Sequence, residues 1–290
     1  MAVYYVLFNP YAGNGHGAAE AEKLHSVLSG HEVHLYDMTQ IGSYADFFAA
    51  LNADDRIVVA GGDGTLNRFI NDTADVTIPG DVYYYATGSG NDFLHDLGKE
   101  KGAEPFCINA YLRDLPTVTV KGKEYRFLNG IGYGIDGYCC EVGDELRGKT
   151  DKPVNYAAIA IKGLLFHYRP THATVTVDGK TFTYPKTWLA PTMNGRFYGG
   201  GMMTVPTQNR LDPEHKVSLM VMHGAGKLKT LAVFPSIFKG KHVEHTEMVA
   251  IHSGYEITVA FDRPTALQID GETVLGVTEY TVRSRAAVLA

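Results

Sequence analysis

Cysteine is scarce in this chain, with 3 among 290 residues. Two of them, Cys139 and Cys140, are adjacent, so the cysteines form neither a disulfide framework nor the spaced pairs of a zinc site. A chain without these crosslinks is typical of a reducing compartment. We therefore expect a cytoplasmic protein.

Long apolar runs are also absent, because no stretch approaches the roughly 18 residues that a membrane-spanning helix needs. The apolar run 3–8 follows no basic segment and ends at Asn9 and Pro10. This pattern is typical of a strand entering a turn and differs from a secretory signal.

Positive charge is not in excess, since 26 Lys and Arg residues stand against 32 Asp and Glu residues for a net charge of −6. A general nucleic-acid binder normally carries a basic surplus, so we expect no nucleic-acid partner. Hydrophobic residues make up 45% and aromatic residues 11%, which excludes a disordered chain. The length suits one large or two medium domains.

The first hundred residues alternate between short apolar runs and helical segments. We expect strands at 3–8, 33–36, 56–60 and 82–86, and helices at 18–28, 44–51 and 65–71. Repeated strand–loop–helix units predict parallel strands with crossover helices. Residues 1–118 are therefore expected to form an α/β domain.

After about residue 115 the pattern changes to short β-branched or aromatic runs separated by turns. The expected strands are 117–120, 125–128, 174–177, 181–184, 217–222, 255–259, 266–269 and 280–283. Asp178-Gly179 between two of them is a strong hairpin signal. We expect residues 119–290 to form an antiparallel β-sandwich domain, with helical insertions at 156–166 and 227–238.

Three glycine-rich loops, 9–17, 61–65 and 87–92, each follow a predicted strand of the first domain. Loops at the carboxyl ends of parallel strands share one edge of the sheet, where ligands bind. Glycines at a strand-to-helix junction can present N–H groups to a phosphate, and Asp63 is then best explained by Mg²⁺ between them. The alternative is an ordinary glycine turn capped by Thr65. The common P-loop and dinucleotide fingerprints are both missing.

Six segments in chain order resemble the bacterial diacylglycerol kinase/lipid kinase family, which shares its catalytic fold with sphingosine kinases and, more distantly, with NAD kinases. They are Asn9-Pro10, the Gly-Gly-Asp-Gly-Thr-Leu-Asn run at 61–67, the Thr-Gly-Ser-Gly-Asn-Asp-Phe run at 87–93, 129–136, 194–201 and the Gln-Ile-Asp-Gly-Glu run at 268–272. The resemblance covers nearly the whole chain.

The resemblance implies a kinase that binds ATP and Mg²⁺ through an N-terminal domain and carries its acceptor site and catalytic base in the second. The implied nucleotide-binding residues are Asn9, Gly13, Gly61, Gly62, Gly64, Thr65, Asn67, Gly88, Gly90, Asn91 and Asp92. Asp270 is implied as the general base, with Glu272 nearby and Asp63 acting at the metal and the phosphates. Without the other motifs, Asp270-Gly271 is better interpreted as a hairpin turn.

Two positions depart from the family pattern. Arg68 stands where the family usually has glutamate, which puts nucleotide contacts there in question. The family also has an acidic loop that holds a structural Mg²⁺, and the corresponding stretch 211–217 keeps Asp212 and Glu214 but loses the glycine and a later acid. Asp212 remains a candidate metal ligand, and we expect this second site to be unconventional.

The resemblance predicts a lipid kinase that phosphorylates a hydroxyl of diacylglycerol or a related lipid in phospholipid biosynthesis. An NAD kinase, another small-molecule kinase or a catalytically silent nucleotide-binding regulator are the alternatives. We also expect segment 226–245 to touch the inner membrane surface, because apolar residues lie between lysines at both ends. A helix packed on the β-domain is the alternative there. The oligomeric state stays open, a homodimer included.

Overall fold

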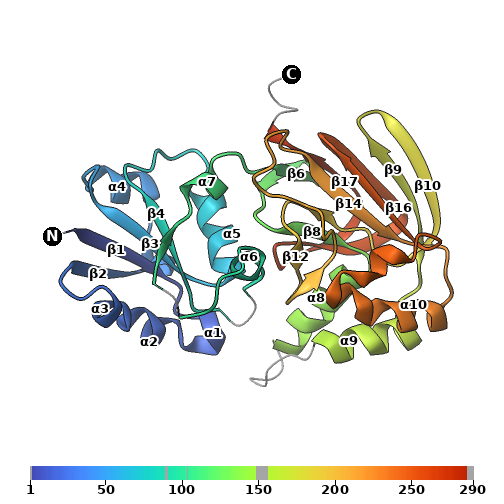
Figure 1. The fold of residues 1–290 in the computed structure, drawn as a ribbon, viewed down its shortest axis with the longest axis horizontal. Coiled ribbons are helices and arrows are strands. Elements are labelled where there is room, and N and C mark those ends of the chain that lie inside the picture. Colours follow the sequence, from blue (N-terminus) through green and yellow to red (C-terminus); the bar gives the residue numbers. More distant parts are fainter. Residues whose placement is uncertain (1, 89–90, 103, 148–155, 286–290) are drawn as a thin grey trace. The chain divides into compact units, whose positions relative to one another are not determined.

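The computed structural model describes residues 2–88, 91–102, 104–147 and 156–285. The chain divides into two compact units, Met1–Arg113 and Asp114–Ala290 (Figure 1). The first unit is α/β with a mostly parallel sheet, and the second is built on an antiparallel sheet. The fold class expected from the sequence is therefore confirmed.

The sheet of the first unit has the strand order β2-β1-β3-β4-β5. Its strands are β1 (Val3–Phe8), β2 (Glu32–Asp37), β3 (Arg56–Gly61), β4 (Val82–Ala86) and β5 (Phe106–Cys107). The pairs among the first four are parallel and β5 is antiparallel to β4. Because the parallel strands share one direction, the segments that follow β1, β3 and β4 leave from the same edge.

Helices connect these strands. They are α1 (Ala12–Gly15), α2 (Gly17–Glu22), α3 (Leu24–Val27), the 3₁₀ turn η1 (Met38–Gln40), α4 (Tyr44–Ala49), α5 (Asp63–Asp72), α6 (Asp92–Asp96) and α7 (Asn109–Leu112). α5 buries Leu66, Phe69 and Ile70, which share one helical face.

Three expectations for this unit need correction. The loop 9–17 contains the helical turn α1, and the helix expected at 18–28 is divided between α2 and α3 at Lys23. α5 begins at Asp63 and not at Thr65, so Asp63 and Gly64 belong to its first turn. A carboxylate in the first turn of a helix interacts favourably with the helix dipole, which offsets the low helix propensity of Gly64.

The sheet of the second unit has the order β15-β14-β11-β8-β16-β17-β6-β7, and β9 joins it beside β16 and carries β10. Its strands are β6 (Thr117–Val120), β7 (Lys123–Arg126), β8 (Gly130–Tyr133), β9 (Thr171–Val177), β10 (Lys180–Thr187), β11 (Thr192–Met193), β14 (Val217–Met222), β15 (Val249–Gly254), β16 (Glu256–Ile269) and β17 (Glu272–Arg283). A small separate sheet pairs β12 (Phe197–Tyr198) with β13 (Met202–Met203). Two expected strands, 255–259 and 266–269, are the two ends of β16, whose register with β17 shifts between Ala260 and Thr265.

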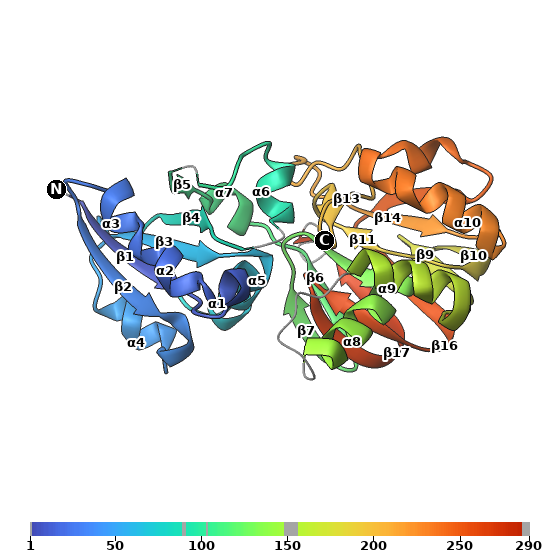
Figure 2. The same ribbon diagram turned by 90° about the horizontal axis from the view of Figure 1, so that it is seen from below.

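Figures 1 and 2 show α8, α9 and α10 together on one side of this sheet. The helical segments are α8 (Ile135–Arg147), α9 (Tyr156–Lys162), the π turn η2 (Gly163–His167), α10 (Lys227–Val233) and the 3₁₀ turns η3 (Phe234–Lys239) and η4 (Lys241–Glu244). α8 was not expected from the sequence. One buried cluster lies within the sheet around Tyr133 and Val259, and a second lies between the sheet and these helices around Trp188 and Leu164.

Candidate functional site

The three glycine-rich loops of the first unit pack against one another. A β-carbon on Gly88 would lie 2.5 Å from the Cα atom of Gly62, and one on Gly13 would lie 2.8 Å from the Thr87 carbonyl oxygen. The backbone N–H groups of Thr87 and Gly88 donate to the Gly61 carbonyl oxygen at 2.8 and 3.2 Å. Side chains at these glycines would push the loops apart, so the glycines are needed for this close approach.

Gly62→Val tests this packing. The Gly62 φ of −108° suits any residue, so the obstacle is the Gly88 backbone, whose Cα would lie 3.1 Å from the new β-carbon. If the first unit binds ATP, as the resemblance implies, the variant should bind it roughly tenfold or more weakly, because overpacking typically costs about 1–3 kcal/mol and pushes apart the loops whose N–H groups would meet the phosphates. Calorimetric titration of the folded variant measures this. Gly42→Val is the control, since no atom lies within 4 Å of its β-carbon position, and wild-type affinity in both variants would refute the prediction. Gly90, which the sequence also singles out, lies outside the described residues.

Asp63 joins two of the loops. Its Oδ2 accepts from the backbone N–H of Asp92 at 2.7 Å, and its Oδ1 accepts from that of Phe93 at 3.0 Å. These are N–H groups of the first turn of α6, so the carboxylate acts as its cap. The same carboxylate lies in the first turn of α5, so its negative charge stands at the N-termini of both helices.

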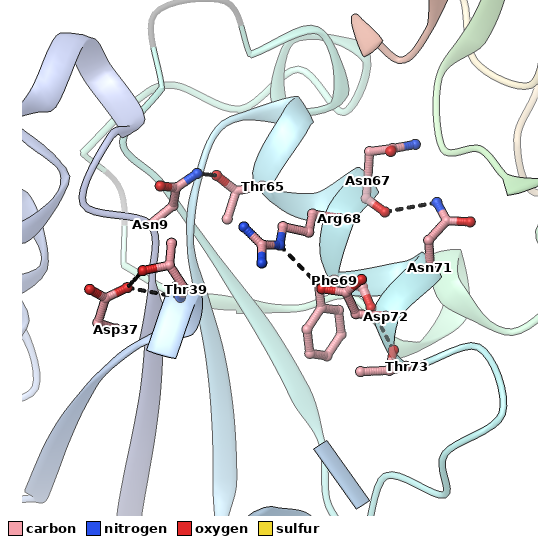
Figure 3. Close-up of polar contacts among 10 residues, drawn as sticks. All are labelled: Asn9, Asp37, Thr39, Thr65, Asn67, Arg68, Phe69, Asn71, Asp72 and Thr73. Atoms are coloured by element: carbon pink, nitrogen blue, oxygen red, sulfur yellow. Dashed lines mark hydrogen bonds and ion pairs between the residues drawn. The ribbon is translucent and has the colours of Figure 1, made fainter. Parts of the chain in front are cut away.

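Asn9 and Thr65 connect the first loop to α5, as Figure 3 shows. The Asn9 Nδ2 donates to the Thr65 Oγ1 at 3.5 Å, and the Thr65 side chain fills the space where a β-carbon of Gly61 would lie. Asn67 follows Asp63 by four residues on the same face of α5 and is buried, while Gly64 is exposed.

Arg68 extends from α5 in the direction opposite to Asn67 in Figure 3. Its Nε donates to the Asp72 Oδ2 at 3.2 Å, an i,i+4 ion pair in which both side chains are roughly half exposed. Arg68, which stands where the family usually has glutamate, therefore pairs with a carboxylate of its own helix.

Asn91 and Tyr84 stabilise the third loop. The Asn91 Nδ2 donates to the Gly88 carbonyl oxygen at 3.0 Å, and the Tyr84 hydroxyl donates to the Gly61 carbonyl oxygen at 3.1 Å. Burial raises the pKa of the Tyr84 hydroxyl well above its usual value, so this group remains a neutral donor. The sequence pattern did not single out Tyr84, because a tyrosine in a buried strand is usually a packing residue.

In the second unit, Asp270 lies in the two-residue turn between β16 and β17, and its buried carboxylate reaches the start of β8. Oδ1 accepts from the backbone N–H groups of Asn129 and Gly130 at 2.8 and 2.9 Å, and Oδ2 accepts from that of Leu128. Glu272 is exposed at the first position of β17. The hairpin that the sequence predicts at Asp270-Gly271 is confirmed, with φ values of 46° and 99°.

The carbonyl side of the same segment is held by two further side chains. Asn194 Nδ2 and Arg210 Nη1 donate to the Leu128 carbonyl oxygen at 2.9 and 3.0 Å. Arg210 Nη2 also donates to the Asn129 Oδ1 at 3.1 Å. Segment 128–130 is therefore bonded through its N–H groups to the Asp270 carboxylate and through the Leu128 carbonyl group to the Asn194 and Arg210 side chains. Arg210 carries no local sequence signal, because its partners lie about eighty residues away in the chain.

The Asp212 loop forms a turn of its own. Asp212 Oδ1 accepts from the backbone N–H of Glu214 at 3.2 Å, and the Glu214 carboxylate pairs with Lys216 at 2.6 Å. Throughout the described part of the chain, no group of three or more His, Cys, Asp and Glu side chains is arranged to hold a metal ion. A metal at Asp212 therefore remains an expectation of the resemblance alone.

Two family models match the chain. The first is described as the diacylglycerol kinase catalytic domain and matches residues 3–120, and the second, the YegS C-terminal NAD kinase beta sandwich-like domain, matches residues 129–289. The two matches lie almost entirely within the two structural units, and the second spans more than half of the chain.

Curated relatives and solved structures agree with these models. A diacylglycerol kinase of Bacillus subtilis (strain 168) is 25% identical over 279 residues, which cover 92% of this chain and 88% of the relative. One of Mycobacterium tuberculosis (strain ATCC 25618 / H37Rv) is 26% identical over 207 residues, covering 69% and 65%. A crystal structure of a diacylglycerol kinase from Bacillus anthracis str. Sterne shares the fold, with a TM-score of 0.61, 17% identity and coverage of 98% and 93%.

Proposed function

Because this chain belongs to the diacylglycerol kinase family, we propose that it is an ATP-dependent lipid kinase. It transfers the γ-phosphate of ATP to a hydroxyl of diacylglycerol or a related lipid. The observation that carries the proposal is the convergence of three glycine loops beside the N-terminus of α5, in a chain whose two units match the two family models in order.

In this proposal the first unit binds the nucleotide. The N-terminus of a helix attracts phosphate through its N–H groups and its dipole, and α5 is ten residues long. The donor set fits Mg²⁺ because carboxylate oxygens are the ligands that this ion prefers, and Asp63 places its carboxylate where α5 and α6 both begin. When bound, Mg²⁺ neutralises the charge that develops on the phosphates.

The second unit supplies the acceptor side. Phosphoryl transfer to an alcohol needs a group that receives the hydroxyl proton. We assign this role to Asp270, whose buried carboxylate is fixed by the backbone N–H groups of residues 128–130. Glu272, exposed and two residues further on, adds negative charge beside it.

The decisive experiment offers labelled ATP and Mg²⁺ to a panel of lipids, with NAD as one further acceptor. We expect label in a lipid with a free hydroxyl, diacylglycerol included. Label in NAD alone would identify a soluble-substrate kinase on the same fold. ATP binding without transfer to any acceptor would identify a nucleotide-binding regulator.

A lipid kinase must also reach its substrate, and we propose that segment 226–245 contacts the membrane surface. The structure limits the residues that can do so to those whose side chains are exposed. Val233 and Ile237 are buried and Leu231 packs on the core, as the alternative interpretation expected, whereas Leu228 is 80% and Phe238 46% exposed. Phe166, 72% exposed, lies in the π turn that packs against α10. In the described residues no helix is long and apolar enough to cross a membrane.

Charge reversal on this surface gives the corresponding prediction. Changing Lys227, Lys229, Lys239 and Lys241 together to Glu should weaken binding to anionic vesicles by roughly tenfold or more, since each basic residue near such a surface contributes about 1 kcal/mol. Lys229 contributes less than an unpaired lysine would, because it pairs with Glu247 at 2.8 Å. Vesicle co-sedimentation measures this. The control changes four exposed lysines elsewhere, at positions 99, 101, 123 and 180. Equal binding of both variants would exclude the proposed surface.

A further inference from the structure

The turn that carries Asp270 leaves one backbone donor without a role in the hairpin. Ile269 pairs with Glu272 across the two-residue loop, so the N–H of Gly271 has no partner in the strand ladder. The side chain of Gln268 accepts from this N–H through Oε1 at 2.6 Å. A side chain two residues before Asp270 therefore stabilises the turn from within.

The other end of the Gln268 amide reaches Asp136 in the first turn of α8. Because the Gly271 N–H can only donate, Oε1 is the accepting atom of the amide and Nε2 is left as the donor. The Gln268 amide lies beside the Asp136 carboxylate and opposes the rise in its pKa that burial causes, and the Asp136 Oδ2 accepts from the Tyr198 hydroxyl at 3.0 Å. Gln268 thus connects the turn to a buried carboxylate on a different element.

Gly132 shows how closely this connection is packed. It pairs with Gln268 between β8 and β16. A β-carbon on Gly132 would lie 1.6 Å from the Asp136 Oδ2 and 2.5 Å from the Gln268 Nε2. The two polar groups occupy the space of the missing side chain, so a glycine at this position is a requirement of the connection.

We propose that Gln268 is a positioning residue that couples the buried Asp136 to the turn, and so sets where Asp270 holds segment 128–130. The coupling itself is a property of the second unit, and its consequence for catalysis rests on the proposed kinase function. Without Gln268, the turn loses its internal acceptor, and only the bonds to segment 128–130 then hold the Asp270 carboxylate.

Amide hydrogen exchange tests the coupling without reference to activity. Gln268→Met keeps the length of the side chain and removes both polar atoms. We expect exchange at Gly271 and at residues 128–130 to accelerate at least several-fold. The control is Ser218→Ala, which removes a buried polar atom elsewhere in the same sheet, one that bonds Ser253 at 2.7 Å. Wild-type exchange at these amides in Gln268→Met would overturn the proposal, as would equal acceleration in the control.

Gln268→Glu gives a second test, which also serves if Gln268→Met does not fold. Burial raises the pKa of Asp136 to about 6, and a second carboxylate beside it raises the affinity of the pair for a proton. With one shared proton the pair can keep both bonds, and without it the two charges repel. The ratio of variant to wild-type exchange at 128–130 should therefore fall toward one as the pH is lowered from 8 to 5. A ratio independent of pH would contradict the coupling.

The other titratable groups that face Asp136 do not produce this pH dependence. They are Tyr198, Cys139, Tyr168 and Tyr280, and burial raises the pKa of each above the range tested. Cys140 also lies on α8, and exchange in wild-type protein over the same pH range accounts for its contribution.

Steady-state kinetics of phosphate transfer test the consequence of this coupling for catalysis. If the kinase assay succeeds with wild-type protein, Gln268→Met should lower kcat at least roughly tenfold and leave the KM for ATP near its wild-type value, because the nucleotide loops belong to the other unit. Unchanged kcat with accelerated exchange would refute the catalytic consequence. If wild-type protein transfers phosphate to no lipid, the proposed function fails and the exchange data still decide the coupling.

Discussion

Asp270→Asn should lower the turnover of phosphate transfer by roughly two to four orders of magnitude, because asparagine cannot receive the hydroxyl proton. From the sequence alone the change would leave the melting temperature nearly unaltered, since the two side chains have the same shape. The structure predicts a loss of stability as well. The carboxylate accepts three backbone N–H bonds through two oxygens, and asparagine offers only one accepting oxygen.

The size of the stability loss follows from the geometry. If the amide oxygen replaces Oδ1, the bonds from Asn129 and Gly130 remain and the Leu128 N–H faces an NH₂ group. An unsatisfied buried donor costs about 1–3 kcal/mol. In a unit of this size that lowers the melting temperature by roughly 2–10 °C. Thermal denaturation and initial rates with the best lipid measure the two effects separately.

Two controls separate the proton-accepting role of Asp270 from its structural role. Asp178 lies in another Asp-Gly hairpin, with φ 47°, and its Oδ1 accepts from the N–H groups of Tyr255 and Glu256 at 2.9 and 2.8 Å. Asp178→Ala removes the acceptor of both bonds, and it should lower stability and leave turnover unchanged. Asn194→Ala loosens segment 128–130 from its carbonyl side and leaves Asp270 intact. Turnover of Asp270→Asn within tenfold of wild type, or an equal loss in Asn194→Ala, would assign Asp270 a structural role only.

Local chemistry in the sequence was enough to predict the hairpins and the glycine loops. Asp178-Gly179 and Asp270-Gly271 both adopt positive φ at two consecutive residues, as the Asp-Gly signal indicates. The loops meet because parallel strands end at one edge, which follows from the strand–helix alternation. In each case a few neighbouring residues determine the result.

The features that the sequence did not reveal depend on partners distant in the chain. Asp270 bonds N–H groups about 140 residues away, and Gln268 lies beside Asp136 on another element. α8 begins at Ile135 and contains Gly137, residues of modest helix propensity, and it is stabilised by packing against β16. Local patterns identify residues with the right chemistry and leave open which of them meet.

Asp63→Asn should weaken ATP binding in the presence of Mg²⁺ by at least roughly tenfold to a hundredfold, the loss that mutation of a residue supporting a metal ligand already causes. The change keeps one accepting oxygen for the first turn of α6 and removes the other, together with the negative charge. Loss of a capping bond costs about 0.5–2 kcal/mol, so the melting temperature should fall slightly. Titration with ATP in Mg²⁺ and again in EDTA separates the two contributions, because only the charge acts through the metal.

Asp72→Asn is the matched control at the other end of α5, where it breaks the exposed pair with Arg68. That variant should keep wild-type affinity in both titrations, since an exposed pair contributes little. An equal loss of ATP affinity in Mg²⁺ and in EDTA for Asp63→Asn would mean that Asp63 only caps α6, and that another group holds the metal.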